Sequence, residues 1–248
     1  MAFSEYSISP KAGFEKNKEN CSAILVFIPL VGLIIGVCIN RWGVAYPYLC
    51  NYSVFPAVVG AVLPILLSAG SHLNGFFRTV DALCSHKSKE ERIKILREDA
   101  HGGYFAIIVC TCFFLVSLGI WSEMPIEGCF LVSFQYVISR SVAGIMLLTM
   151  KHADEGKADA FIPEKSLWKW LQVIILSVYI VVCAVWMVSI HRSVGIACLL
   201  AAAVAYLYCM LTAKKNFGGV MEEISGYFVV LCEIVVPIAA LFVYKKWF

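Results

Sequence analysis

Charged residues are scarce in this sequence. Asp, Glu, Lys and Arg make up 15% of the 248 residues, whereas a soluble domain carries about 25%. The hydrophobic share is 60%, and the mean hydropathy is +0.81. An ordinary water-soluble domain is therefore excluded, because so few charges could not cover a water-facing surface.

The sequence also lacks the patterns of two common kinds of site, a cysteine-based zinc or redox site and a nucleic-acid-binding surface. The chain has eleven cysteines but no C-x-x-C pair, so it lacks the usual spacing of a zinc or redox site. The formal net charge is only +3, and the basic residues form no single stripe, which excludes nucleic-acid binding. Most cysteines lie in apolar runs, where we expect them to act as small apolar side chains in a reducing compartment.

Long apolar runs are what the sequence does contain. A helix that crosses a membrane needs about 20 residues, and seven runs approach that length. They cover residues 22–40, 52–70, 103–121, 128–150, 168–190, 193–213 and 226–244. We therefore predict an all-α polytopic membrane protein with about seven transmembrane helices, in which residues 1–248 form a single integral membrane domain. The first run follows a polar stretch and lacks a cleavage site, so we expect it to be retained as a span.

The positions of Lys and Arg predict the orientation. Fourteen of the twenty lie in segments that alternation places on one side, and four lie on the other. The first group occupies the tail 1–21 and the loops 71–102, 151–167 and 214–225. Because cytoplasmic loops retain positive charge, we predict a cytoplasmic N-terminus in the cytoplasmic (inner) membrane of a prokaryote. The same loops hold nearly all the loop acids, so any chemistry is expected there.

The loop 71–102 has the richest set of polar side chains. Asn74, Arg78 and Asp81 are spaced i, i+4, i+7, which on a helix puts them on one face, and His72 comes just before them. Such a face can hold a metal ion or a phosphate. An interfacial helix with an Arg78–Asp81 pair is the alternative.

Two further signals follow in the same loop. Ser88 and Glu91 have the spacing of a capping box, which predicts the start of a short helix. Asp99, His101 and Gly103 stand at the mouth of the third run, where an acid can bind a divalent cation and glycine permits close approach. A helix cap is the alternative for these three residues.

Arg140 lies near the middle of the fourth run. An ionisable side chain at that depth costs roughly 2.5–3.5 kcal/mol, so it normally faces a polar cavity. A guanidinium there suits bidentate recognition of phosphate, and pairing with an acid such as Glu233 is the alternative. The remaining histidines have no metal-ligand spacing and are expected on the surface: His86, His152 and His191.

Paired glycines and acids precede the last run. Gly218 and Gly219 are followed by Glu222 and Glu223, and together they can bring backbone amides and carboxylates to one ligand. Adjacent carboxylates repel each other unless a cation is near. A turn with solvated acids is the alternative.

The order of these segments resembles one family. The matching pieces are Phe3-Ser-x-Tyr6-Ser7-x-x-Pro10, Phe27-x-Pro29-Leu-x-Gly32-x-x-x-Gly36, Gly70-x-His72-Leu-x-Gly75-x-x-x-Thr79-x-Asp81, the run from Lys94 to Asp99, Ser139-Arg140-Ser141, and Phe217-Gly-Gly219 with Gly226. The order and spacing of these pieces resemble those of cobalamin synthases, the adenosylcobinamide-GDP ribazoletransferases, over nearly the full length of the chain.

The resemblance implies a transferase that joins α-ribazole to adenosylcobinamide-GDP and gives adenosylcobalamin and GMP, the last steps of cobalamin biosynthesis, with Mg²⁺ as cofactor. It implies that Asp81, Asp99 and Glu223 are catalytic and hold the metal with Asn74. The expected substrate-binding residues are His72, Asn74, Arg78, His101, Arg140, Gly218 and Gly219. The lipid bilayer is the expected environment, and a homo-oligomer or a complex with other cobalamin-assembly enzymes stays open.

The chain departs from the family pattern in its acidic motif. Where the family reads His-Leu-Asp-Gly-x-x-Asp-x-x-Asp, this chain has Asn74 and Arg78 and keeps only Asp81. Glu223 stands at the position of the acid in Gly-Gly-x-Thr-Gly-Asp, and Ala100 replaces a serine. Two alternatives follow: a non-catalytic paralogue that binds corrinoid or nucleotide, and a small membrane transporter that uses an Arg140–Glu233 pair.

Overall fold

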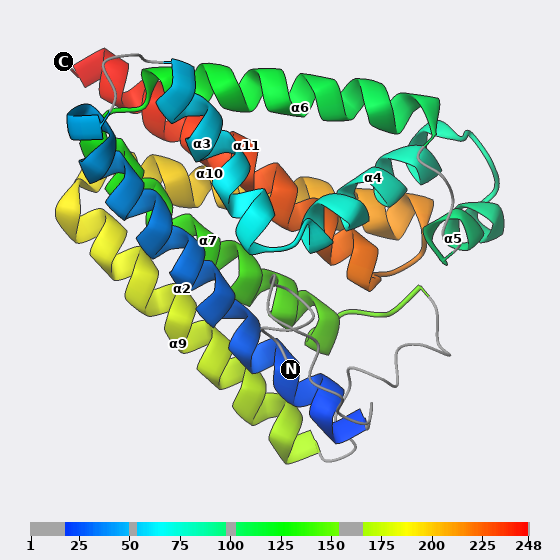
Figure 1. Ribbon diagram of the computed structural model, residues 1–248. Coiled ribbons are helices and arrows are strands. Elements are labelled where there is room, and N and C mark those ends of the chain that lie inside the picture. Colours follow the sequence, from blue (N-terminus) through cyan, green and yellow to red (C-terminus); the bar gives the residue numbers. More distant parts are fainter. Residues whose placement is uncertain (1–17, 50–53, 98–102, 154–165, 248) are drawn as a thin grey trace.

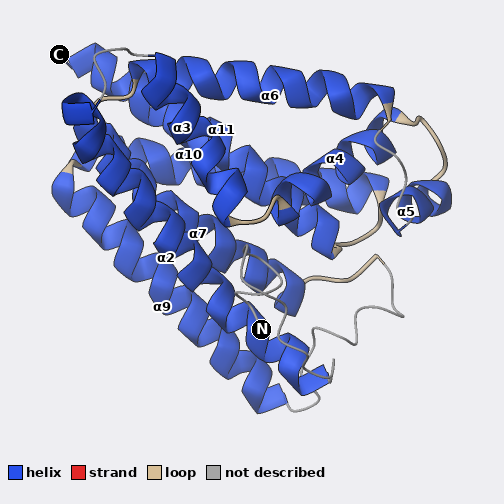
Figure 2. Cartoon of the chain, viewed as in Figure 1, coloured by secondary structure: helices blue, strands red, loops and turns tan. Residues whose placement is uncertain are grey.

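The computed structural model describes residues 18–49, 54–97, 103–153 and 166–247, and helices make up nearly all of this part of the chain. Figure 2 shows helices joined by short loops, with no strand among the described residues. The helices are α2 (Lys18–Leu49), α3 (Val54–Leu67), α4 (Ser71–Cys84), α5 (Lys89–Arg97), α6 (Tyr104–Glu123), α7 (Ile126–Thr149), α9 (Ser166–Ile190), α10 (Arg192–Asn216) and α11 (Glu222–Trp247).

Six of these helices are long and apolar enough to cross a membrane: α2, α6, α7, α9, α10 and α11. The bent pair α3 and α4 brings the number to seven if it is taken as one span. The prediction of an all-α polytopic membrane protein with about seven spans is thus confirmed.

The prediction of one straight second span over residues 52–70 was wrong. The region 52–70 does not hold one straight span, because α3 has only 14 residues, or about 21 Å of helix, and hydrocarbon is about 30 Å thick. The chain then bends by 91° into α4. Ala69 and Gly70 make this turn with φ of 50° and 68°, the left-handed region that Gly adopts without strain. Likewise, the predicted loop 71–102 contains the two helices α4 and α5.

The chain turns gather at two ends of the bundle (Figure 1). We call one the connector end: among the described residues it holds 42–49, 54–56, 121–127, 190–192 and 243–247. We call the other the loop end: it holds α4, α5, residues 151–153 and residues 214–223. Figure 1 shows α3 and α4 together carrying the chain from the connector end to the loop end.

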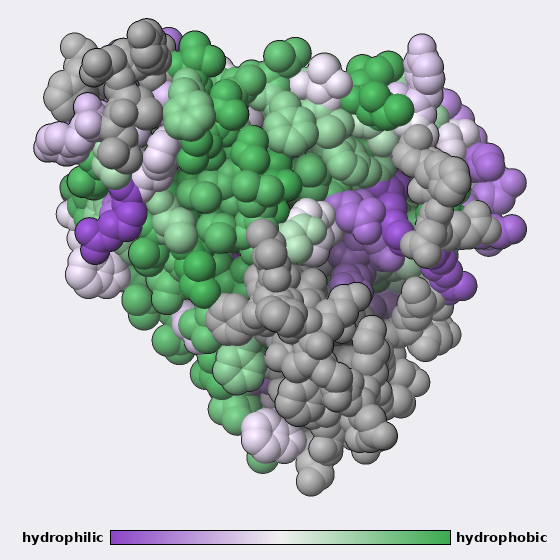
Figure 3. All heavy atoms as spheres, viewed as in Figure 1, coloured by the Kyte–Doolittle hydropathy of each residue, from purple (hydrophilic) through white to green (hydrophobic). Residues whose placement is uncertain are grey.

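Helix α7 lies at the centre of the bundle, and most of its side chains are buried. Gly32 and Gly36 of α2 face the backbone of α7 at Tyr136 and Ser133, so the two helices approach closely through small residues four apart. On the visible face, apolar side chains cover much of α2 and α3, and polar ones gather around α4 and α5 (Figure 3). The polar segments are therefore concentrated at the loop end.

Candidate functional site

Helix α4 presents the polar face that its sequence predicts. Residues 71–84 are helical, so Asn74, Arg78 and Asp81 share one face. Asn74 is exposed, and the other two are half-buried. A neighbouring apolar face anchors the helix, because the ring of Phe76 stacks on that of Tyr227 in α11 with 5.4 Å between centroids. Packing on α11 therefore turns the polar residues of α4 toward the surface of the loop end.

Asp81 caps the first turn of α6. The backbone N–H of Gly103 donates to Asp81 Oδ2 at 2.6 Å, and that of Ala106 donates to Oδ1 at 3.2 Å. A helix N-terminus has unpaired N–H groups and a positive dipole, so a carboxylate stabilises it. A Cβ at position 103 would collide with this carboxylate, which explains why glycine stands there. A helix cap was the alternative for Asp99, His101 and Gly103, and the side chain that caps this helix is instead Asp81 from α4.

Helix α5 is tied to two neighbours. Arg78 Nη1 donates to the carbonyl oxygen of Leu96 at 3.2 Å, which links α4 to α5. Arg92 Nη1 donates to Asn216 Oδ1 at 2.6 Å, which links α5 to the end of α10. Because Leu96 is fully buried, α5 packs its apolar side on the protein.

The predicted capping box forms at the start of α5. The backbone N–H of Ser88 donates to Glu91 Oε2 at 3.1 Å, and the backbone N–H of Glu91 donates to Ser88 Oγ at 3.4 Å. These bonds favour the ionised carboxylate and lower the pKa of Glu91 below its ordinary value, the Ser88 backbone contributing most. The prediction of a short helix here is confirmed.

Helices α4 and α11 cross closely at two glycines. A Cβ on Gly75 would lie 2.8 Å from the carbonyl oxygen of Glu223. A Cβ on Gly226 would lie 3.1 Å from the carbonyl oxygen of His72. This crossing brings the first turn of α11, with half-buried Glu223, against the helix that carries Asn74. Two segments about 150 residues apart in the sequence therefore meet at the loop end.

Gly218 and Gly219 are each required by their backbone surroundings. Gly218 has φ of 81° and ends α10 with its N–H donating to the carbonyl of Ala213 at 3.0 Å, as glycine often does after a helix. Gly219 packs against the backbone of residues 151–153, where Val220 N–H donates to the Lys151 carbonyl at 2.8 Å. These glycines shape the turn that leads into α11.

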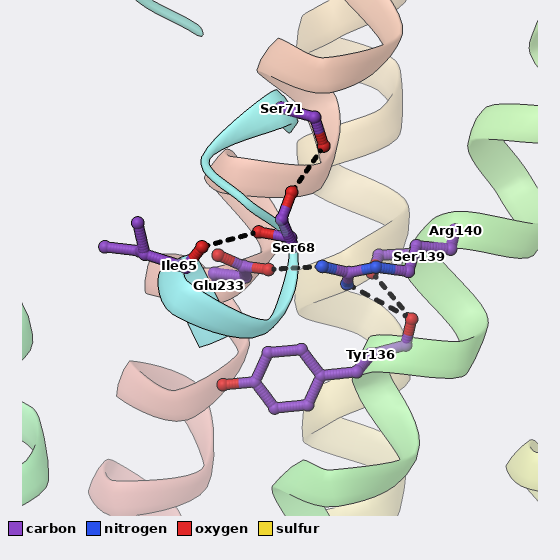
Figure 4. Close-up of polar contacts among 7 residues, drawn as sticks. All are labelled: Ile65, Ser68, Ser71, Tyr136, Ser139, Arg140 and Glu233. Carbon is purple, nitrogen blue, oxygen red and sulfur yellow. Dashed lines mark hydrogen bonds and ion pairs between the residues drawn. The ribbon is translucent and has the colours of Figure 1, made fainter. Parts of the chain in front are cut away.

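Arg140 lies inside the bundle. Its side chain is 0% exposed, and Nη2 is 3.1 Å from Oε1 of Glu233 in α11. Nη1 donates to the carbonyl of Tyr136 at 3.3 Å. Figure 4 shows the guanidinium pointing from α7 toward Glu233. The pairing with Glu233, one of the two alternatives raised by the sequence, is present.

The other predicted residues fall in different surroundings. His72 is buried in the first turn of α4. Asp99 and His101 lie outside the described residues. His152, expected on the surface, is buried, with Nε2 2.7 Å from the carbonyl of Leu147. That expectation was wrong because the parallel bridge between His152 and Val220 draws this segment under the turn before α11.

The acids at the loop end suit a hard cation. Asp81 and Glu223 offer carboxylate oxygens and Asn74 an amide oxygen, the ligands that Mg²⁺ prefers. Within the described ranges no group of three or more His, Cys, Asp or Glu could hold a metal. Mg²⁺ in phosphoryl-transfer sites is bound by one or two carboxylates plus substrate phosphates, and these side chains are of the same donor type.

Some of these features could not be read from the sequence. Asp81 reaches Gly103 across 22 positions, and Arg92 reaches Asn216 across 124. No periodicity predicts such long-range contacts. The glycines at 75 and 226 were visible in the sequence, and their close packing became clear only in three dimensions.

Helices able to cross a membrane, with polar side chains gathered at the loop end, define a multi-pass helical membrane protein. The family model for cobalamin-5-phosphate synthase matches residues 1–241. The chain therefore belongs to the cobalamin-5-phosphate synthase family.

Curated relatives cover nearly the whole chain. An adenosylcobinamide-GDP ribazoletransferase of Lachnoclostridium phytofermentans is 28% identical over 241 residues, which are 96% of this chain and 91% of that protein. A protein of the same name from Clostridium botulinum is 28% identical over 95% of this chain and 93% of its own. One from Shigella boydii is 25% identical over 90% and 89%. No solved structure matches the chain significantly.

Proposed function

We propose that this chain is an adenosylcobinamide-GDP ribazoletransferase, which joins α-ribazole to adenosylcobinamide-GDP and releases adenosylcobalamin and GMP. The observation that supports this most is the family match over residues 1–241, shared with relatives of that name. The crossing of α4 with the start of α11 supplies a candidate site for this reaction.

The reaction exchanges one phosphate ester bond for another. The hydroxyl oxygen of α-ribazole forms a bond to the phosphorus attached to cobinamide. The bond from that phosphorus to the bridging oxygen of the diphosphate breaks, and GMP leaves with this oxygen. The hydroxyl proton is lost to a base. Such transfer depends chiefly on positioning and on neutralisation of phosphate charge.

Three residues at the loop end would hold Mg²⁺: Asp81, Glu223 and Asn74, joined by Asp99 from outside the described residues. A bound Mg²⁺ supplies neutralisation of the negative charge on the diphosphate. Asp81 already accepts bonds from the first turn of α6, and each carboxylate oxygen has two lone pairs, so capping and binding are compatible.

Arg78 is the group best suited to contact the diphosphate itself. It is half-buried on the polar face of α4, and a guanidinium presents a fork of donors that matches phosphate oxygens. Gly218 and Gly219 shape the turn that holds Glu223. His72 and His101 remain proposed substrate contacts, His72 from the first turn of α4.

We place this site on the cytoplasmic side of the bacterial cytoplasmic membrane. The relatives come from bacteria, and α5, Lys151 and the pair Lys214–Lys215 bring basic side chains to the loop end, as is typical of cytoplasmic sides. Labelling of a cysteine introduced at Lys214, in a variant whose eleven native cysteines are replaced, with impermeant maleimide in intact cells tests the orientation. We expect no labelling until the cells are opened.

Turnover by purified protein tests the proposed function. Protein in detergent with Mg²⁺, adenosylcobinamide-GDP and α-ribazole should yield adenosylcobalamin and an equal amount of GMP. The Lachnoclostridium phytofermentans relative, prepared in the same way, is the positive control. Product from the relative and none from this chain would contradict the proposal.

Asn74 and Arg78 favour a second candidate, a family member that binds corrinoid or nucleotide without turnover. Together they replace two acids of the family motif, which weakens the attraction for a cation. The double variant Asn74→Asp with Arg78→Asp tests it. A large gain in turnover would support a decayed site, and a loss would show that the present residues are adapted to the reaction.

A further inference from the structure

We infer that Arg140 and Glu233 are a positioning pair: their buried contact fixes the register of α11, and thereby the place of Glu223 against α4. The effect on catalysis rests on the proposed function, and the effect on the structure of α11 does not. The inference replaces the expectation that Arg140 itself contacts phosphate.

The pair joins three helices at the centre of the bundle. Arg140 comes from α7 and reaches Glu233 of α11 at 3.1 Å, with exposures of 0% and 10%. A Cβ at Gly32 of α2 would lie 3.0 Å from Arg140 Cδ, so the stem of the arginine fills the space that glycine leaves. The Arg140 guanidinium carbon also lies 5.6 Å from the centre of the Tyr136 ring.

A displacement of α11 at Glu233 would also move its first turn at the candidate site. Glu233 follows Glu223 by ten residues, or about 15 Å of helix. The first turns of α11 meet α4 where Gly75 and Gly226 leave no space for a Cβ. A shift or rotation of α11 would therefore press its backbone into α4 or separate the two helices.

Depth and burial argue against a direct contact between Arg140 and substrate. Arg140 precedes Thr149, the last residue of α7, by nine positions, which puts it about 14 Å from that end. Its side chain has no exposed surface. A buried ion pair is sensitive to loss of one partner, because the other charge is then left alone in a medium of low dielectric constant.

Four variants separate positioning from substrate contact. Arg140→Met leaves the Glu233 carboxylate unpaired; Arg140→Met with Glu233→Leu removes both charges; Arg140→Glu with Glu233→Arg exchanges them. Glu123→Gln is the matched control, since it breaks the exposed Lys245–Glu123 pair at the connector end. The readouts are kcat and KM for adenosylcobinamide-GDP, and hydrogen exchange of residues 222–228.

We expect Arg140→Met to lower kcat about 100-fold with little change in KM and to speed exchange of residues 222–228. The apolar double variant or the exchanged pair should recover kcat to within about tenfold of wild type and restore protection. Glu123→Gln should change neither. If the wild type shows no turnover, the proposed function is contradicted. Hydrogen exchange of residues 222–228 alone then tests whether the Arg140–Glu233 pair positions α11.

Three results would overturn the inference. Protection and kcat unchanged in Arg140→Met would show that the pair positions nothing. Wild-type protection with no turnover in both double variants would show that Arg140 contacts substrate. Double variants as unprotected as the single variant would show that pairing is not what holds α11.

Discussion

The two ends of the bundle are held together by different forces. At the connector end, Trp42 packs edge-on against Phe55 with centroids 6.5 Å apart, and its indole N–H donates to the carbonyl of Pro56 at 3.0 Å. Trp121 covers Gly60 in the same region. Such contacts are spread over large apolar areas and close short turns between neighbouring helices.

At the loop end, charged side chains bind the backbone and side chains of segments far away in the sequence. Asp81 holds the start of α6, and Arg92 holds the end of α10. We expect one substitution there to loosen a whole segment, whereas at the connector end packing is shared by many residues. Substitutions at the candidate site should therefore loosen the fold more than substitutions at the connector end do.

Substitution of Asp81 should have the largest effect at the loop end. Asp81→Asn keeps one of the two acceptor oxygens that bind Gly103 and Ala106, so it should lower the thermal unfolding midpoint less than Asp81→Ala does. It lacks the charge that binds Mg²⁺, so kcat should fall by about 100-fold or more. Asp81→Ala should lose both kcat and about 1 kcal/mol of stability. Turnover and thermal unfolding of the two variants check this, and full activity in Asp81→Asn would remove Asp81 from the metal site.

The glycine crossing gives the next largest effect. Gly75→Ala places a Cβ 2.8 Å from the backbone of Glu223, so we expect a loss of about 1–3 kcal/mol in stability. Gly119→Ala, in α6, is the matched control because no atom lies within 4 Å of its Cβ. It should be neutral or stabilising by up to about 1 kcal/mol. Thermal unfolding in detergent compares the two, and equal destabilisation would refute close packing at Gly75.

Arg92 tests the tie between α5 and α10. Arg92→Met keeps the apolar stem and removes the 2.6 Å bond to Asn216, which should cost about 1 kcal/mol. Hydrogen exchange should quicken in residues 89–97 and 214–221 and stay unchanged at the connector end. A response spread evenly over both ends would contradict the difference between them.

The smallest effect concerns pH. Because the pKa of Glu91 is lowered by its bonds from Ser88, the ionised carboxylate stabilises α5 at pH above the unfolded value of about 4.3. This contribution is lost as pH falls through the lower, folded pKa. Protection factors of residues 89–97 should therefore drop in mild acid, and Glu91→Gln should abolish the drop. The same acid sensitivity in Glu91→Gln would assign it to another group.

Much of the fold followed from apolar runs and charge. The spans α6, α7, α9, α10 and α11 match predicted runs closely because each is long and uninterrupted. The second span failed because composition alone does not reveal that Ala69 and Gly70 turn the chain by a right angle. Hydropathy measures how apolar a segment is, and says nothing of where a helix breaks.

The candidate site was predicted in part. The shared face of Asn74, Arg78 and Asp81 depends only on helical spacing, and it formed as expected. The tasks of individual residues depend on tertiary contacts, so capping of α6 by Asp81 could not be foreseen. For Arg140 the sequence left phosphate and Glu233 as alternatives, and only the packing of α7 on α11 brings the two side chains to 3.1 Å.

The Mg²⁺ dependence of turnover tests most directly whether α4 and α11 build one site. It should be measured for the wild type, Asp81→Asn and Glu223→Gln. We expect each substitution to raise the Mg²⁺ concentration for half-maximal turnover by about tenfold or more, because carboxylates from both helices would share one ion. An unchanged Mg²⁺ requirement in both variants would contradict a shared site.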